Sequence, residues 1–351
     1  MSPFTPYWKG LLALTIGASG AFIFIYLGMS LPWVLGSMSA CAIVSLCGYQ
    51  LKVPSLWRSG ALATIGTILG GSFDVDTVHA LPSWSISIGF MLLMTVCYLL
   101  VSYQILSRWS NMSRLTAMFS AVPGGLAIVS AISEMYNADT RRIALSHSAR
   151  LVALLILVPI ILKFIGQHAI PKSTLPSFSI AIDSESLVGY GVLSLCAVAG
   201  LVLAHLCRFP TGVLLFPIIL SATAHASGLI TTQVPLVIAS IAQTILGTSI
   251  GIRFVGYRWR DIFYDGWLSI VIGVLLALLA MSAALLLSYV FGLDFAPLLL
   301  VFLPGGAPEV GVMALALDID PAMVASHHML RLLALVGGIS WVLSRYLPAK
   351  P

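Results

Sequence analysis

Two copies of one pattern follow each other along this chain at a constant offset of 181 residues, the difference between positions 304 and 123. Pro-Gly-Gly begins a stretch at Pro123 and again at Pro304, and residues 123–154 and 304–335 share 11 of 32 positions without a gap. Residues 54–73 and 235–254 share 7 of 20 positions at the same offset. Ungapped identity of this kind indicates an internal duplication, so a fold must accommodate the same pattern twice.

A water-facing surface of ordinary size cannot be built from this composition. Of the 351 residues, 59% are hydrophobic and only 8% are charged, whereas about a quarter of a soluble domain is charged. We therefore predict a membrane protein whose main partner is the lipid bilayer. The net charge of +5 does not indicate a nucleic-acid partner, because Lys and Arg in such a chain mark cytoplasmic loops. The five cysteines form no CxxC pair, and we expect neither a metal nor another cofactor.

Apolar runs divide the chain into helices, and no strand pattern is present. Six runs fall in each half, so we predict an all-α polytopic membrane protein. We assign 1–165 to membrane repeat 1, 166–184 to a polar linker and 185–351 to membrane repeat 2. The expected segments are 10–28, 33–49, 57–73, 83–106, 114–136, 141–165, 186–206, 212–229, 235–252, 266–291, 296–317 and 321–346.

The positive charges favour inverted repeats, each with about five spans and one broken or re-entrant Pro-Gly-Gly segment. With both termini in the cytoplasm, this topology places 13 Lys and Arg residues inside and two outside, whereas twelve full spans divide them nine to six. Another short segment, such as 33–49, remains an alternative re-entrant element. The cytoplasmic residues would be Lys9, Lys52, Arg58, Arg108, Arg114, Arg141, Arg142, Arg208, Arg253, Arg258, Arg260, Arg345 and Lys350.

Each Pro-Gly-Gly motif interrupts an apolar run. Proline removes an amide donor and glycine relaxes the backbone, so a helix is expected to break there. The second half-helix then begins with unpaired amides and a partial positive charge, which suit an anion. A simple kink is the alternative. The motifs are Pro123-Gly124-Gly125 and Pro304-Gly305-Gly306.

Glu309 lies five residues after Pro304 and is the one acid well inside an apolar run. An ionisable residue at such a place is a functional candidate by default. Its partner in the first copy is Ile128, so its task is performed once, which fits the binding of a coupling proton or cation. Alternatively, the carboxylate serves the helix terminus or pairs with an arginine.

Arg150 and Arg331 each lie eleven residues past an aspartate, Asp139 or Asp320, which we expect to be a helix cap. At 1.5 Å per residue, each arginine is roughly 16 Å into its helix. His147 and His328 precede them by three residues on the same helical face. We predict that these pairs bind the solute, with His328 a second candidate proton carrier. Alternatively, the arginines hold carbonyls freed by the broken segments.

These motifs resemble those of the membrane AbrB-duplication family, over nearly the whole chain. The resemblance rests on AVPGGLAIVSAISEMYNADTRRIALSHSARLV and FLPGGAPEVGVMALALDIDPAMVASHHMLRLL. It implies a bacterial inner-membrane protein, from a family whose members are named ammonia monooxygenases or regulators. This chain departs from the family pattern at Ala307-Pro308-Glu309, where Leu-Pro-Glu is usual, and at Phe216, where a glycine is usual.

Three functions follow from these observations. A secondary transporter of a small, anionic solute working by alternating access fits the repeats, the broken helices and the two buried arginines. A membrane regulator of gene expression is the alternative, and it would act indirectly because the expected loops are short. A monooxygenase would need clustered metal ligands, which the seven histidines do not form, so we expect no enzyme.

Overall fold

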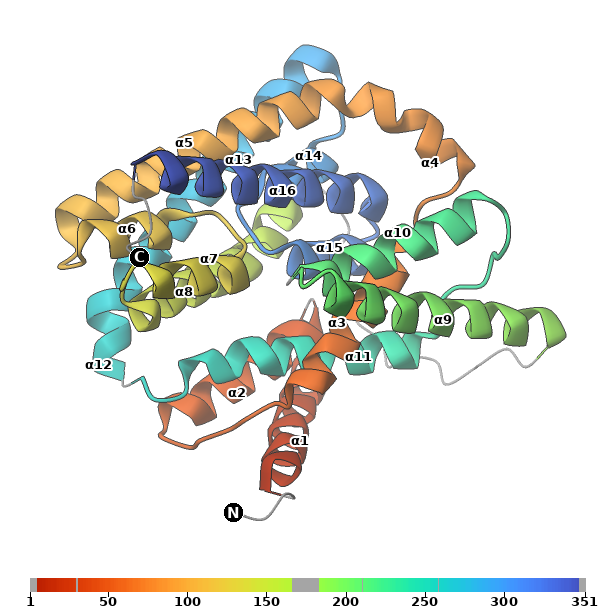
Figure 1. Ribbon diagram of the computed structural model, residues 1–351, viewed down its shortest axis with the longest axis horizontal. Helices are drawn as coiled ribbons and strands as arrows, with labels where there is room; N and C mark the ends of the chain where they lie inside the picture. The colour runs from red at the N-terminus through yellow and green to blue at the C-terminus, as the bar shows by residue number, and fades with distance from the viewer. Residues whose placement is uncertain (1–4, 30, 166–182, 210, 258, 347–351) are drawn as a thin grey trace. The chain divides into compact units, whose positions relative to one another are not determined.

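The computed structural model describes residues 5–29, 31–165, 183–209, 211–257 and 259–346, and this part of the chain is helical without a strand. Figure 1 shows the helices in chain order. Most of the expected linker, 166–182, lies outside the described residues. The helices of the first copy are α1 (Thr5–Tyr26), α2 (Ser37–Leu46), α3 (Ser55–Gly70), α4 (Val75–Ala80), α5 (Ser85–Trp109), α6 (Arg114–Ala121), α7 (Leu126–Met135) and α8 (Thr140–Phe164).

The second copy repeats this order. Its helices are α9 (Ser184–Leu206), α10 (Gly212–Ala226), α11 (Leu236–Gly251), α12 (Trp259–Asp261), α13 (Trp267–Phe291), α14 (Phe295–Phe302), α15 (Ala307–Ala316) and α16 (Pro321–Tyr346). All twelve predicted apolar segments are therefore helical. Two of them are split, and each split falls at a Pro-Gly-Gly motif.

Local sequence signals fix several helix starts. Asp139 accepts a hydrogen bond from the Arg142 amide (3.0 Å) at the start of α8, which confirms it as a cap. Asp183 caps α9 in the same way, and its hydrogen bonds from Ser186 hold the pKa of its carboxyl below the usual value. Asp320 directly precedes α16, which begins with Pro321, a residue favoured at the first helical position.

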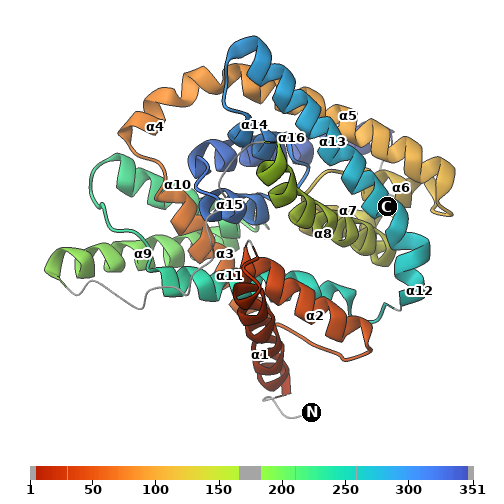
Figure 2. The ribbon, with the colours of Figure 1, turned by 180° about the vertical axis from the view of Figure 1, so that it is seen from behind.

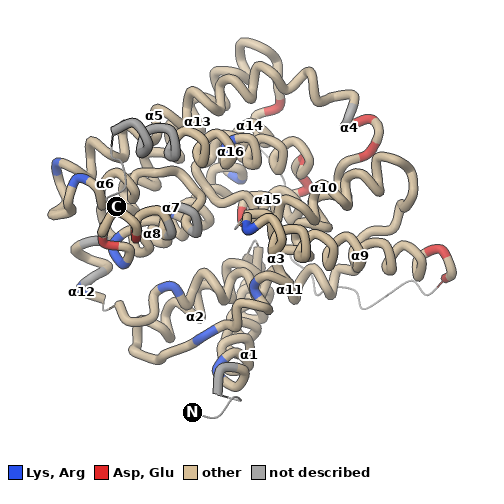
Figure 3. Tube along the Cα trace, viewed as in Figure 1, with Lys and Arg blue, Asp and Glu red and all other residues tan. Residues whose placement is uncertain are grey.

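Six helices in the described residues are long and apolar enough to cross a membrane. Shorter apolar helices, including α10 and α15, accompany them. Most of the trace in Figure 3 carries no charge, as a lipid-facing chain requires. The structure is thus that of an all-α polytopic membrane protein. The six spanning candidates are Tyr7–Tyr26, Leu81–Trp109, Thr140–Phe164, Ser184–Leu206, Leu236–Phe254 and Trp267–Phe291.

The chain forms two compact units, and each unit takes helices from both copies. Unit 1 comprises the described residues of Met1–Pro82, Ala169–Arg258 and Gly311–Ala322. Unit 2 comprises those of Ser83–His168, Trp259–Val310 and Met323–Pro351. The repeats of the sequence are therefore not the compact units of the fold.

In unit 1 the helices of the two copies pack on each other at glycines that occupy matched positions, 181 residues apart. A methyl group at Gly66 of α3 would lie 2.7 Å from the Leu214 carbonyl oxygen of α10. At the matched position of α11, Gly247 meets the Val34 carbonyl, in a π-helical turn (Pro32–Gly36) that leads into α2. Gly70 and Gly251 repeat the arrangement one turn later. These glycines permit close helix crossing, as small-residue faces do in membranes.

In unit 2, buried polar pairs join helices of the two copies. Ser146 of α8 is hydrogen-bonded to Ser269 of α13 (2.7 Å), and α8 and α13 lie side by side in Figure 2. Position 327 is the partner of 146 at the offset of 181, and His327 of α16 is hydrogen-bonded to Ser87 of α5 (2.8 Å). Each copy thus holds the other through the same position of its last long helix.

Candidate functional site at the two interrupted helices

Both predicted helix breaks are present. α6 ends at Ala121 and α7 begins at Leu126, whereas α14 ends at Phe302 and α15 begins at Ala307. Gly124 (φ +98°) and Gly125 (φ +67°) adopt left-handed backbone conformations that a residue with a side chain rarely takes. The simple-kink alternative is therefore wrong, because each motif separates two distinct half-helices. The motifs and their surroundings to Val310 belong to unit 2.

Arg150 holds the first break. It is only 3% exposed, and its guanidinium donates hydrogen bonds to the Ser120 carbonyl (3.2 Å) and the Val122 carbonyl (2.6 Å). These carbonyls belong to the end of α6, where intrahelical partners are missing. The alternative that an arginine holds freed carbonyls is thus correct for this residue.

Arg331 holds the second break in the same way. It is 2% exposed and donates to the carbonyls of Leu303 and Gly305, the latter at 2.6 Å. Val122 and Leu303 are 181 residues apart, so an equivalent hydrogen bond from arginine to a carbonyl is present in each copy. Arginine has five N–H donors, and each of these two guanidinium groups has donors without a partner among the described residues.

The histidines bond the half-helix that precedes each break. His147 Nε2 lies 3.1 Å from the Phe119 carbonyl oxygen, and His328 Nε2 lies 2.9 Å from the Leu300 carbonyl oxygen, again at the common offset. His328 Nδ1 also accepts a hydrogen bond from Arg331 (2.6 Å). Because arginine can only donate, Nδ1 carries no hydrogen and Nε2–H donates to Leu300. His328 is therefore held as one neutral tautomer.

The two breaks touch each other. A methyl group at Gly124 would lie 3.3 Å from the Gly305 carbonyl oxygen, and one at Gly125 would lie 3.3 Å from Leu332. Arg150 and Arg331 are close enough to interact electrostatically. The residues predicted from the sequence are therefore brought together: two Pro-Gly-Gly motifs, two arginines and two histidines, with the starts of α7 and α15 at the same place.

Glu309 lies in the first turn of α15 and is 6% exposed. It is the only buried acid among the described residues. Its Oε2 has no hydrogen-bond partner in the described part of the chain, and the carboxyl group folds back over Gly306, where an added methyl would lie 2.8 Å from the carboxyl carbon. No ion pair joins it to either arginine among these residues, so pairing with an arginine is not what holds it.

Two neighbours were not among the site residues predicted from the sequence. Tyr98 of α5 is 1% exposed, its hydroxyl has no partner among the described residues, and it interacts electrostatically with Arg331. His327 is fully buried between Ser87 and the Met323 carbonyl (2.7 Å). The polar residue Ser146 at the matched position could have drawn attention to His327. Nothing in the apolar run that contains Tyr98 distinguished that residue.

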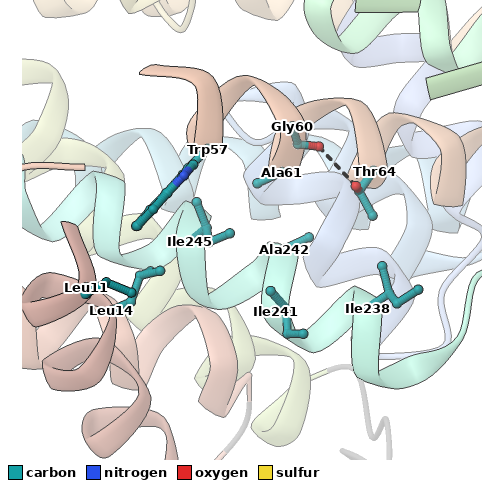
Figure 4. A pocket seen from close by; sticks show the side chains of 10 residues that line it. All are labelled: Leu11, Leu14, Trp57, Gly60, Ala61, Thr64, Ile238, Ile241, Ala242 and Ile245. Atoms are coloured by element: carbon teal, nitrogen blue, oxygen red, sulfur yellow. Dashed lines mark hydrogen bonds between the residues drawn. The ribbon is translucent and has the colours of Figure 1, made fainter. Parts of the chain in front are cut away.

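An open groove of about 390 Å³ is present elsewhere, in unit 1, and carries no ionisable side chain (Figure 4). It runs between α3 and α11 at matched positions such as Ala61 and Ala242, with α1 along one side. Its lining is that of a lipid-facing surface, so the interrupted helices are kept as the candidate site. The described residues contain no group of three His, Cys, Asp or Glu side chains that could hold a metal ion.

Comparison with known proteins identifies the family of this chain. The family described as transition state regulatory protein AbrB matches residues 33–346. The chain belongs to the AbrB family. Among AbrB relatives, "Putative regulator AbrB" of Escherichia coli (strain K12) is 26% identical over 98% of both chains. "Uncharacterized protein YhjN" of Bacillus subtilis (strain 168) is 23% identical over 93% of this chain and 90% of its own length. The family resemblance drawn from the motifs is confirmed.

Proposed function

We propose that this AbrB-family membrane protein is a secondary transporter of a small, anionic solute. The observation that carries the proposal is the meeting of two interrupted helices over two buried arginines. Half-helix starts and guanidinium groups both favour negative charge. Since the described site holds two guanidinium groups against one buried carboxyl group, its balance of charge favours an anion.

Alternating access would supply the transport cycle. Inverted repeats can form two arrangements of similar energy, in which one bundle rocks against the other around a fixed site. We propose a location in the bacterial inner membrane, as the family resemblance implies, with both termini in the cytoplasm, as the positive charges favour. A coupling proton or cation would bind at Glu309, because His328 is already committed to Arg331 and Leu300.

Flux into proteoliposomes tests the proposal. Purified protein is reconstituted and offered labelled carboxylates, amino acids and inorganic anions with an imposed pH or sodium gradient. We expect uptake of at least one anion by the wild type and its loss in Arg331→Ala, with Arg108→Ala on the exposed end of α5 as control. Wild-type vesicles that take up no anion would refute the function, whereas uptake by Arg331→Ala equal to that of the wild type would refute the role of Arg331 in binding the solute.

The names of the relatives favour a second candidate, a regulator of gene expression. Regulation through a transported solute and regulation through a partner protein make different predictions. If a variant without transport keeps the regulatory phenotype of the wild type, regulation is the primary role. If the phenotype disappears with transport, it is a consequence of the solute.

A further inference from the structure

The start of α15 already contains a carboxyl group, that of the chain's own Glu309. α15 has ten residues, and the amides of its first turn lack intrahelical partners, although Pro308 supplies no amide. The carboxyl group of Glu309 lies over Gly306, directly before the first helical residue. This is the place where a bound anion would meet the helix terminus.

Glu309 is held there only weakly. In a capping box, a glutamate at this position of a helix accepts a hydrogen bond from the amide that precedes the helix. Here Oε2 makes no hydrogen bond within the described residues, although 94% of Glu309 is buried (6% exposed). An unpartnered buried carboxylate is costly, so a better-bonded anion can replace it at that position.

The matched position of the other half-helix has no acidic residue. The residue of α7 that matches Glu309 is Ile128, which has no charge. The two starts are adjacent, since Gly124 and Gly305 are in contact. One copy therefore has a carboxyl group at this position of its half-helix, and the other copy has an isoleucine.

We propose that the start of α15 is a carboxylate-binding seat for which Glu309 competes with the transported solute. The inference rests on the proposed function and names its substrate class, small carboxylates, because a carboxyl group of the chain itself already lies at this position. Glu309 is a specificity-determining residue on this view. A solute carboxylate binds when the Glu309 side chain leaves.

Binding of succinate to the purified full-length protein in detergent tests the seat. Removal of the competitor tightens binding by the inverse of the fraction of time for which the seat is free, about tenfold if the seat is free a tenth of the time. We expect Glu309→Gln to bind succinate about tenfold more tightly than the wild type. Glu309→Asp, whose shorter side chain withdraws the carboxylate, should lie between them. Thermal melting over a succinate series gives the affinities.

The matched control is Glu134→Gln, which removes an exposed glutamate at the far end of the sister half-helix α7. It should bind succinate as the wild type does. Equal affinity of Glu309→Gln and wild type overturns the seat, as does succinate binding to none of the proteins. Equal tightening for sulfate and succinate overturns the assignment to carboxylates.

Binding and flux separate this inference from the proposed function. If succinate binds and Glu309→Gln tightens it, but no anion crosses proteoliposomes, the seat stands and transport is wrong. If anions cross but Glu309→Gln leaves every affinity unchanged, transport stands and the seat is wrong.

Discussion

At the scale of single residues, the arginines are structural supports as well as candidate ligands for the solute. Arg150 and Arg331 each bond carbonyls at the end of a half-helix, and a buried carbonyl without a partner costs about 1–3 kcal/mol. The sequence predicted the place of these residues from their offset and depth. It left their task open, because hydrogen-bond partners that come from another helix leave no pattern in the chain.

Replacement of Arg331 by lysine keeps the positive charge and removes the planar guanidinium group with its several N–H donors. A single ammonium group cannot reproduce bonds to Leu303, Gly305 and His328 together. We expect Arg331→Lys to lose roughly 2–5 kcal/mol of stability, measured by thermal melting in detergent. Arg108→Lys, near the end of α5, should melt with the wild type. Melting of Arg331→Lys at the wild-type temperature would show that these hydrogen bonds contribute little.

His328 should be replaceable by glutamine. The neutral imidazole donates to Leu300 and accepts from Arg331, and a glutamine amide has a donor and an acceptor for the same two partners. We expect His328→Gln to stay within about 1 kcal/mol of the wild type and to retain anion flux, whereas His328→Ala loses stability. Abolished proton-driven uptake in a well-folded His328→Gln variant would instead identify His328 as the proton carrier.

At the scale of helices, glycine positions decide which elements can cross closely. The four-residue spacing of Gly66 and Gly70, and of Gly247 and Gly251, predicts two small-residue packing faces. The structure places a backbone carbonyl against each glycine. The partners, α10 for α3 and α2 for α11, could not be predicted. Glycine spacing defines a face of a helix and says nothing about the helix that covers it.

Alanine at Gly66 should therefore be costly. The added methyl would lie 2.7 Å from the backbone oxygen of Leu214, which cannot rotate away as a side chain can. We expect Gly66→Ala to destabilise the protein by about 1–3 kcal/mol. Gly60→Ala is the matched control on α3, because nothing lies within 4 Å of that position. Equal melting temperatures for the two variants would contradict the close crossing.

At the scale of the whole chain, duplication in sequence and compactness in space divide the molecule differently. The constant offset identified two copies, yet each compact unit draws helices from both. Identity at matched positions shows that two segments fold alike. It cannot show whether a copy packs on itself, since that depends on contacts such as Ser146 with Ser269 and Ser87 with His327.

The inverted topology makes a prediction that a parallel duplication does not share. Asn137 and Asp318 are 181 residues apart, both are exposed, and both follow the second half of an interrupted helix with positive φ angles of 54° and 55°. In inverted repeats with a re-entrant pair in each copy, these turns face opposite sides of the membrane. Twelve full spans would place them on the same side, because six crossings separate them.

Cysteine labelling distinguishes the two topologies. The five native cysteines are replaced by serine, and Asn137→Cys or Asp318→Cys is introduced singly. A membrane-impermeant maleimide is then applied to right-side-out and inside-out vesicles. We expect the cysteine at 137 to react only from the cytoplasmic side and that at 318 only from the opposite side. Labelling of both from one side would exclude inverted repeats, because a two-fold axis in the membrane plane exchanges the sides of matched turns.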